Sequence, residues 1–122
     1  MDALLADDVK ATLKESPRFL LVPPAGFLDM IALESNARLV ITDSGGVQKE
    51  AYFFGKPGVV LRPETEWVEL VREGQATLAD ADPARIITAV EHYLQEGIPA
   101  TPPLFGDGHA AERICDELLR YR

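Results

Sequence analysis

Residues 37–61 read ARLVITDSGGVQKEAYFFGKPGVVL, and this stretch predicts a strand, a helix and a second strand in succession. The apolar runs at 38–42 and 58–61 are short and continuous, as in buried strands. Between them, residues 47–54 predict a helix that ends before Gly55 and Pro57. A strand, a helix and a strand in this order are typical of a parallel sheet whose crossover helices cover its faces.

The rest of the chain continues this alternation. Asp82 before Pro83 is typical of a helix N-cap followed by a first-turn proline. We expect helices at 2–15, 27–37, 47–54, 64–74, 83–97 and 109–121, and strands at 18–24, 38–42, 58–61 and 75–80. The last helix is expected to bury an apolar stripe of Ala111, Ile114, Cys115, Leu118 and Leu119. The predicted fold class is α/β, a three-layer Rossmann-like parallel sheet.

The four predicted strands are fewer than open α/β sheets of this kind usually have. We therefore expect residues 1–122 to form a single, incomplete domain. An open sheet edge exposes unpaired backbone groups. The edge of this sheet is expected to be covered by self-association or by a partner domain.

Composition narrows the classes of function. The net charge of −8 argues against binding to nucleic acid or to an anionic membrane surface, which require clustered basic residues. The chain has two distant histidines, His92 and His109, and one cysteine, so it predicts no metal site. The single cysteine and the acidic first residues, without the pattern of a signal peptide, favour the cytosol. No cofactor is predicted.

The segment DSGG at 43–46 is the main candidate for a binding site. It follows a predicted parallel strand, and ligands of such sheets bind beyond the carboxyl ends of the strands. Glycines there permit a sharp turn and close approach of a ligand, and a helix N-terminus suits a phosphate. Glu50 lies about one turn further on, within reach of ribose hydroxyls. The alternative is a plain turn, in which Ser44 caps the helix and Glu50 is solvated. A P-loop is excluded, since its Lys-Ser/Thr pair is missing.

The longer string resembles the non-hydrolysing UDP-N-acetylglucosamine 2-epimerase family, over about Phe19 to Leu119. The shared motifs are Asp-Ser-Gly-Gly-x-Gln-x-Glu at 43–50, Gly-Lys-Pro at 55–57, Arg-x-x-Thr-Glu at 62–66 and Gly-Asp-Gly at 106–108. The resemblance implies a second domain of the glycosyltransferase-B type, which binds the UDP of a nucleotide sugar.

The resemblance also implies roles for particular residues. They are Ser44, Gly45 and Gly46 for the diphosphate, Glu50 for the ribose, Phe27 and Met30 for the uracil, and Arg62, Thr65 and Glu66 for further substrate contacts. Arg62 can alternatively be a surface residue at a strand end. Trp67 departs from the arginine that members acting on UDP-N-acetylglucosamine commonly carry there. The Thr-Glu-Trp form looks more like relatives that epimerise UDP-2,3-diacetamido-2,3-dideoxyglucuronic acid.

The expected function is the UDP-sugar-binding portion of a C2 epimerase. The family's proton-transferring carboxylates belong to its other domain, so no catalytic residue is predicted here and activity of the chain alone is not expected. Two alternatives remain, the donor-nucleotide half of a glycosyltransferase and a non-catalytic nucleotide-binding module. The expected ligand in each case is UDP or a UDP-sugar.

Overall fold

The computed structural model describes residues 6–121 of the chain. It divides into two compact units at the junction of Asn36 and Ala37. The first unit contains helices α1 (Asp7–Glu15) and α2 (Phe27–Asn36). Both helices were expected, although residues 2–5 of the first predicted helix lie outside the described residues.

The strand predicted at 18–24 is wrong. Residues 19–26 form neither helix nor strand, and Leu20 is 83% exposed. A strand needs a neighbour to which its N–H and C=O groups can bond, and the sheet of the described chain takes its strands from the second unit alone. Pro23 and Pro24 also lack the N–H groups that a ladder requires.

The second unit contains the sheet. Its elements are β1 (Val40–Thr42), α3 (Gly45–Phe53), β2 (Gly58–Val60), α4 (Val68–Arg72), β3 (Ala76–Leu78), α5 (Pro83–Glu96) and α6 (Ala110–Arg120). The strands are parallel in the order β1-β2-β3, with Val40 opposite Gly58 and Gly58 opposite Ala76. The strand-helix alternation predicted from residue 38 onward is therefore confirmed.

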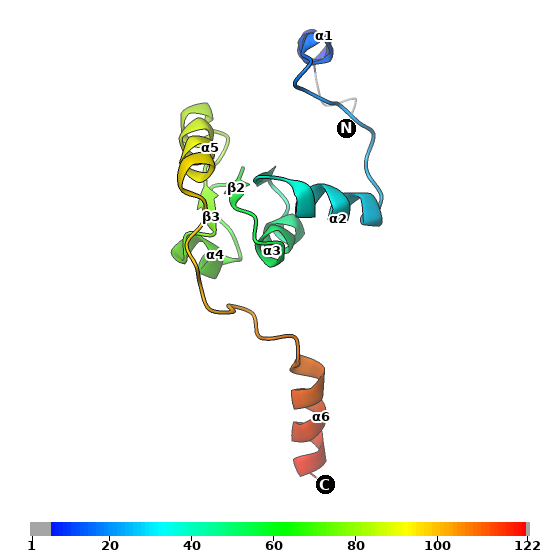
Figure 1. Cartoon of the computed structure of the whole chain (residues 1–122), viewed down its shortest axis with the longest axis vertical. Helices are drawn as coiled ribbons and strands as arrows, with labels where there is room; N and C mark the ends of the chain where they lie inside the picture. The colour runs from blue at the N-terminus through cyan, green and yellow to red at the C-terminus, as the bar shows by residue number, and fades with distance from the viewer. Residues whose placement is uncertain (1–5, 122) are drawn as a thin grey trace. The chain divides into compact units, whose positions relative to one another are not determined.

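Helices cover both faces of the sheet (Figure 1). Val59 and Val60 are both fully buried, and as neighbours in β2 they point to opposite faces. On one face Val59 packs with Ala89 and Tyr93 of α5. On the other, Val60 clusters with Leu70 of α4, and Tyr52 of α3 packs against this cluster. This arrangement confirms the three-layer parallel sheet.

Local capping explains where helix α5 begins. The Asp82 carboxylate accepts hydrogen bonds from the N–H groups of Ala84 and Arg85, at 2.9 and 3.3 Å, and Pro83 occupies the first turn. An N-cap of this kind typically stabilises a helix by about 1 kcal/mol. The cap predicted from the Asp-Pro pair is confirmed.

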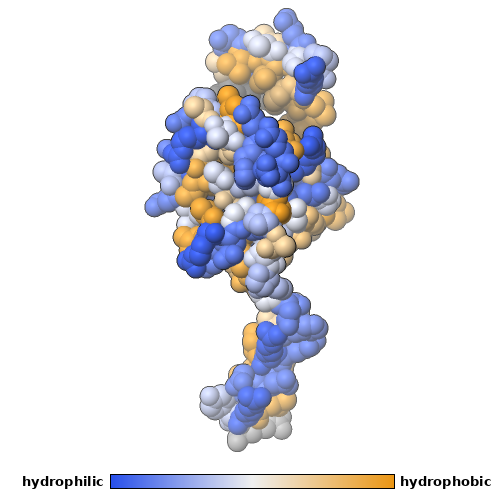
Figure 2. Space-filling model, turned by 60° about the vertical axis from the view of Figure 1, so that its left-hand side comes forward, coloured by the Kyte–Doolittle hydropathy of each residue, from blue (hydrophilic) through white to orange (hydrophobic). Residues whose placement is uncertain are grey.

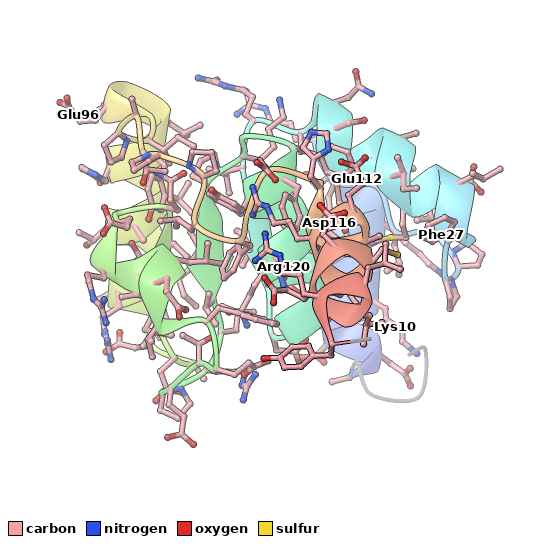
Figure 3. The ribbon with its side chains drawn as sticks, turned by 90° about the horizontal axis from the view of Figure 1, so that it is seen from below. Lys10, Phe27, Glu96, Glu112, Asp116 and Arg120 are labelled. Carbon is pink, nitrogen blue, oxygen red and sulfur yellow. The ribbon has the colours of Figure 1, made fainter. Side chains whose placement is uncertain are left out.

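The burial expected for α6 is wrong. All five residues of its predicted apolar stripe are exposed, Ile114 at 60%, Leu118 at 68% and Leu119 at 55%. Figure 2 shows apolar side chains at the surface of α6 beside polar ones, and Figure 3 shows Glu112, Asp116 and Arg120 along its side. The helical periodicity was correct, but the stripe is not buried by any of the residues 6–121 that the structure describes. Cys115, interpreted as a core residue, is exposed for the same reason.

Within the described part of the chain, no helix is long and apolar enough to cross a membrane.

Candidate functional site

The N-terminus of α3 lies at the carboxyl end of β1, where the sequence placed the binding turn. Ser44 is the N-cap, and its hydroxyl oxygen accepts a hydrogen bond from the N–H of Val47 at 3.3 Å. The Thr42 hydroxyl oxygen in turn accepts from the N–H of Ser44 at 3.0 Å. In the described residues, the N–H groups of Gly45 and Gly46 have no hydrogen-bond partner, as is usual for a helix start. These two N–H groups are therefore available to an anion.

Gly45 and Gly46 differ in what surrounds them. Neither has a positive φ, so the sharp turn expected of them is not the reason for glycine here. A Cβ on Gly45 would lie 1.8 Å from Oε1 of Glu66, whereas a Cβ on Gly46 would meet nothing closer than the Ser44 Oγ at 3.9 Å. A side chain at 45 would therefore force the carboxylate of Glu66 to move, whereas one at 46 would not.

The turn after β2, residues 62–67, lies against the start of α3. The indole N–H of Trp67 donates to the carbonyl of Gly45 at 2.8 Å, and the Thr65 hydroxyl donates to Oε1 of Gln48 at 2.6 Å. Arg62 pairs with Glu66, with 3.0 Å between Nη1 and Oε2. The structure thus brings the predicted residues Ser44, Gly45, Gly46, Arg62, Thr65 and Glu66 into one region.

The carboxylate of Glu66 is held in its charged form. A hydrogen bond from its own backbone N–H is the largest cause and lowers its pKa; desolvation opposes this, and the guanidinium of Arg62 lowers the pKa further. Arg62 pairs with this carboxylate beside the N–H groups of Gly45 and Gly46.

The remaining predicted residues are less closely tied to this region. Glu50 is exposed in the second turn of α3, on the same helix as the two glycines. Phe27 and Met30 belong to α2 in the first unit, where Phe27 is 74% exposed and projects from the helix (Figure 3). Their assignments to ribose and uracil stay predictions.

Gln48 and an aromatic cluster at this region were not predicted from the sequence. Gln48 is 2% exposed, and its position one turn after Ser44 in the motif was the available signal. Trp67 packs edge-on against Phe105 at 5.7 Å, and the Lys49 ammonium lies 4.4 Å from the centre of the Trp67 ring and 4.5 Å from that of Phe105. Phe105 comes from a segment far along the chain, so no local pattern predicts its contact with Trp67.

A depression lies away from this region, between β3 and α5. Its volume is about 440 Å³, and Thr77, Arg85 and His92 are among the residues that line it. It contains none of the predicted site residues. No group of three or more histidine, cysteine or acidic side chains in the described residues is arranged to hold a metal ion.

Comparison with known proteins identifies the family. The sequence model described as UDP-N-acetylglucosamine 2-epimerase matches residues 3–119. The chain belongs to the UDP-N-acetylglucosamine 2-epimerase family. The resemblance stated from the motifs is thereby confirmed, and the family favours the epimerase hypothesis over the glycosyltransferase one.

Relatives in this family align with most of the length of this chain. A Pseudomonas aeruginosa protein named UDP-2,3-diacetamido-2,3-dideoxy-D-glucuronate 2-epimerase is 46% identical over 99 residues, 81% of this chain and 28% of that protein. A solved UDP-GlcNAc 2-epimerase from Methanocaldococcus jannaschii superposes with a TM-score of 0.80 at 36% identity, over 94% of this chain and 32% of that one.

A second structure from that organism, in complex with UDP-GlcNAc and UDP, superposes with a TM-score of 0.77 at 36% identity. It covers 94% of this chain and 31% of that one. Epimerases of this family have the glycosyltransferase-B type of fold, so the predicted fold class is confirmed. The chain spans about a third or less of the length of these relatives.

Proposed function

We propose that this chain is the UDP-binding portion of a UDP-sugar 2-epimerase. The observation that carries the proposal is the start of α3, where Gly45 and Gly46 present unpaired N–H groups at the carboxyl end of β1. A relative that is 36% identical has a structure in complex with UDP-GlcNAc and UDP. We place the protein in the cytosol on the basis of its composition.

The diphosphate would lie at the N-terminus of α3. The Ser44 oxygen already accepts from Val47, which leaves its hydroxyl proton free to donate to a phosphate oxygen. The N–H groups of Gly45 and Gly46 supply two further donors, and the helix dipole adds about 0.3–1 kcal/mol per charge when exposed. Arg62 supplies the cation once a phosphate displaces Glu66 from it.

The ribose would be held by Glu50. A carboxylate can accept hydrogen bonds from both ribose hydroxyls, and Glu50 is one to two turns along the helix that presents Gly45 and Gly46. Phe27 and Met30 of α2 are proposed to contact the uracil, as the family resemblance implies.

The proposed reaction is inversion at C2 by elimination and return of UDP. Negative charge grows on the diphosphate as UDP leaves, and donors already aimed at that position stabilise the charge without having to reorganise. This chain would supply the leaving-group site. The proton-transferring groups would come from outside these residues.

The proposed substrate is UDP-2,3-diacetamido-2,3-dideoxyglucuronate. Two observations favour it over UDP-N-acetylglucosamine. The 46% identical relative bears the corresponding name, and Trp67 stands where members acting on UDP-N-acetylglucosamine commonly have arginine. Comparing the affinities of the two UDP-sugars would decide between them.

The experiment is an NMR titration of the labelled chain with UDP and, separately, with pyrophosphate. We expect shifts at Ser44–Glu50 and a UDP affinity near 1 mM, about −4 kcal/mol, because the ligand is only partly enclosed. Glu50→Ala should weaken UDP by about 1–3 kcal/mol and leave pyrophosphate nearly unchanged, since pyrophosphate has no ribose. Glu91→Ala, which removes an exposed carboxylate from α5, is the matched control. Shifts located elsewhere, or equal loss of both ligands, would contradict the proposal.

A further inference from the structure

Three contacts attach the turn at 65–67 to the start of α3. The Thr65 hydroxyl donates to Oε1 of Gln48 at 2.6 Å, and the indole of Trp67 donates to the carbonyl of Gly45 at 2.8 Å. Between these residues, the carboxylate of Glu66 lies where a side chain on Gly45 would begin. Glu66 is therefore placed by the residues on either side of it.

The contact between Thr65 and Gln48 involves a buried amide. Gln48 is 2% exposed, and its Nε2 has no hydrogen-bond partner in the described chain. Thr65 is thus the one side chain that satisfies this amide there. A hydrogen bond away from water is stronger than an exposed one, and an unmet buried group is destabilising.

The hydroxyl of Thr65 both donates and accepts a hydrogen bond within the chain. It has a single proton, which goes to Gln48, and its oxygen accepts a hydrogen bond from the backbone N–H of Trp67 at 3.1 Å. Thr65 consequently has no proton left to donate to a substrate. Its position beside the phosphate-binding turn needs another explanation.

We propose that Gln48 and Thr65 form a positioning link, which holds the turn at 65–67 on α3 and so fixes Glu66 and its partner Arg62 beside the N–H groups of Gly45 and Gly46. This inference rests on the proposed function, because it assigns the link a role in binding the diphosphate. Thr65 is then a positioning residue and not a substrate contact. The link joins residues 17 positions apart, so it couples the turns that follow β1 and β2.

Loss of the link should move the turn without unfolding the sheet. The Trp67 ring packs with the buried Val60 and Leu70, and Lys49 and Phe105 contact it from outside. These contacts do not depend on the Thr65 hydroxyl. The turn should therefore remain near α3 when the hydroxyl is removed, but in a less defined position.

The test compares Thr65→Val, which removes the hydroxyl at nearly constant shape, with Thr65→Ser, which keeps it. Thr88→Val is the matched control, because Thr88 also uses its hydroxyl in a hydrogen bond, to Ala84 on α5. Each variant of the full chain is titrated with UDP, pyrophosphate and uridine by NMR. Trp67 is the single tryptophan, so its indole N–H gives one resonance whose solvent exchange reports how firmly the turn is held.

We expect Thr65→Val to weaken UDP and pyrophosphate by about threefold to tenfold, the equivalent of one net hydrogen bond, and to speed indole exchange. Uridine, which has no phosphate, should bind as to wild type. Thr65→Ser and Thr88→Val should resemble wild type with all three ligands.

Wild-type affinity of Thr65→Val for pyrophosphate, an equal loss of uridine, or a failure of Thr65→Ser to restore binding would each overturn the positioning role. If the wild-type chain binds neither UDP nor pyrophosphate, the proposed function itself is wrong. In that case the indole exchange of Thr65→Val still shows whether the link holds the turn, so the two failures are distinguishable.

Discussion

Alanine substitutions at Gly45 and Gly46 should have different effects on stability, although both glycines lie in the first turn of α3. Glycine in a helix is about 0.5–1 kcal/mol less favourable than alanine, and neither residue here has a positive φ that alanine would resist. At Gly46 the new methyl group would meet open space, since the nearest atom is 3.9 Å away. Gly46→Ala should therefore raise the free energy of unfolding by about 0.5–1 kcal/mol.

At Gly45 the same gain is opposed by a collision. The new Cβ would lie 1.8 Å from Oε1 of Glu66, so the carboxylate must retreat by about 1.6 Å to reach ordinary contact at 3.4 Å. The same carboxylate bonds Arg62 through Oε2 at 3.0 Å, so its movement would disturb that pair. We expect Gly45→Ala to show no net gain in stability.

The assay is urea unfolding followed by the fluorescence of Trp67 and by helical circular dichroism. A Glu66→Ala background supplies the control, because removing the carboxylate should allow Gly45→Ala to gain as much as Gly46→Ala does. Equal stabilisation by the two alanines in the wild-type background would refute the reasoning. So would a loss of stability in Gly46→Ala.

Three further predictions concern charge and surface. The backbone N–H of Glu66 and the neighbouring guanidinium lower the pKa of its carboxyl, so NMR should show it titrating below its ordinary value in the folded chain. Its contribution to stability is present above about pH 4 and is lost as the pH falls through the lowered pKa. A titration midpoint at or above the ordinary value would contradict this. Burial raises the pKa of Tyr93, so the chain should lose stability as the pH rises past about 10, where the tyrosine of the unfolded chain ionises first. In urea unfolding, Tyr93→Phe should remove this alkaline loss. At neutral pH the same variant should be less stable by about 0.5–1.5 kcal/mol, because it loses the hydrogen bond with Thr77 at 2.7 Å. The exposed stripe of α6 should cause self-association, measured as an apparent mass by light scattering that rises with protein concentration. The double variant Ile114→Glu, Leu118→Glu should abolish this association and leave the helical content unchanged. A wild-type chain that is as monomeric as the double variant would exclude association through this stripe.

Local sequence predicted the elements of the second unit, although α4 covers only Val68–Arg72 of the helix expected at 64–74. Asp82 before Pro83 starts α5 and Gly55 with Pro57 follows the end of α3, as the sequence indicated, and Ser44 caps α3, as in the plain-turn alternative. Such signals can be read from sequence because a cap, a turn and a helical stripe involve residues within about one turn of one another. The same signals located the candidate binding turn at the end of β1.

Tertiary structure alone decided which apolar segments find partners. The apolar run at 18–24 resembles a buried strand and the stripe of α6 resembles a core face, yet both are exposed in the described part of the chain. A local pattern shows that a segment can be buried, but whether it is buried depends on partners far from it in the sequence. The bonding of the Thr65 hydroxyl likewise could not be predicted without the tertiary structure. Its motif suggested a substrate contact, and only the position of Gln48, 17 residues away on α3, shows that the hydroxyl proton already has an acceptor. Sequence spacing indicates what a side chain can bond to nearby, whereas the packing of α3 against the turn after β2 determines which bonds form.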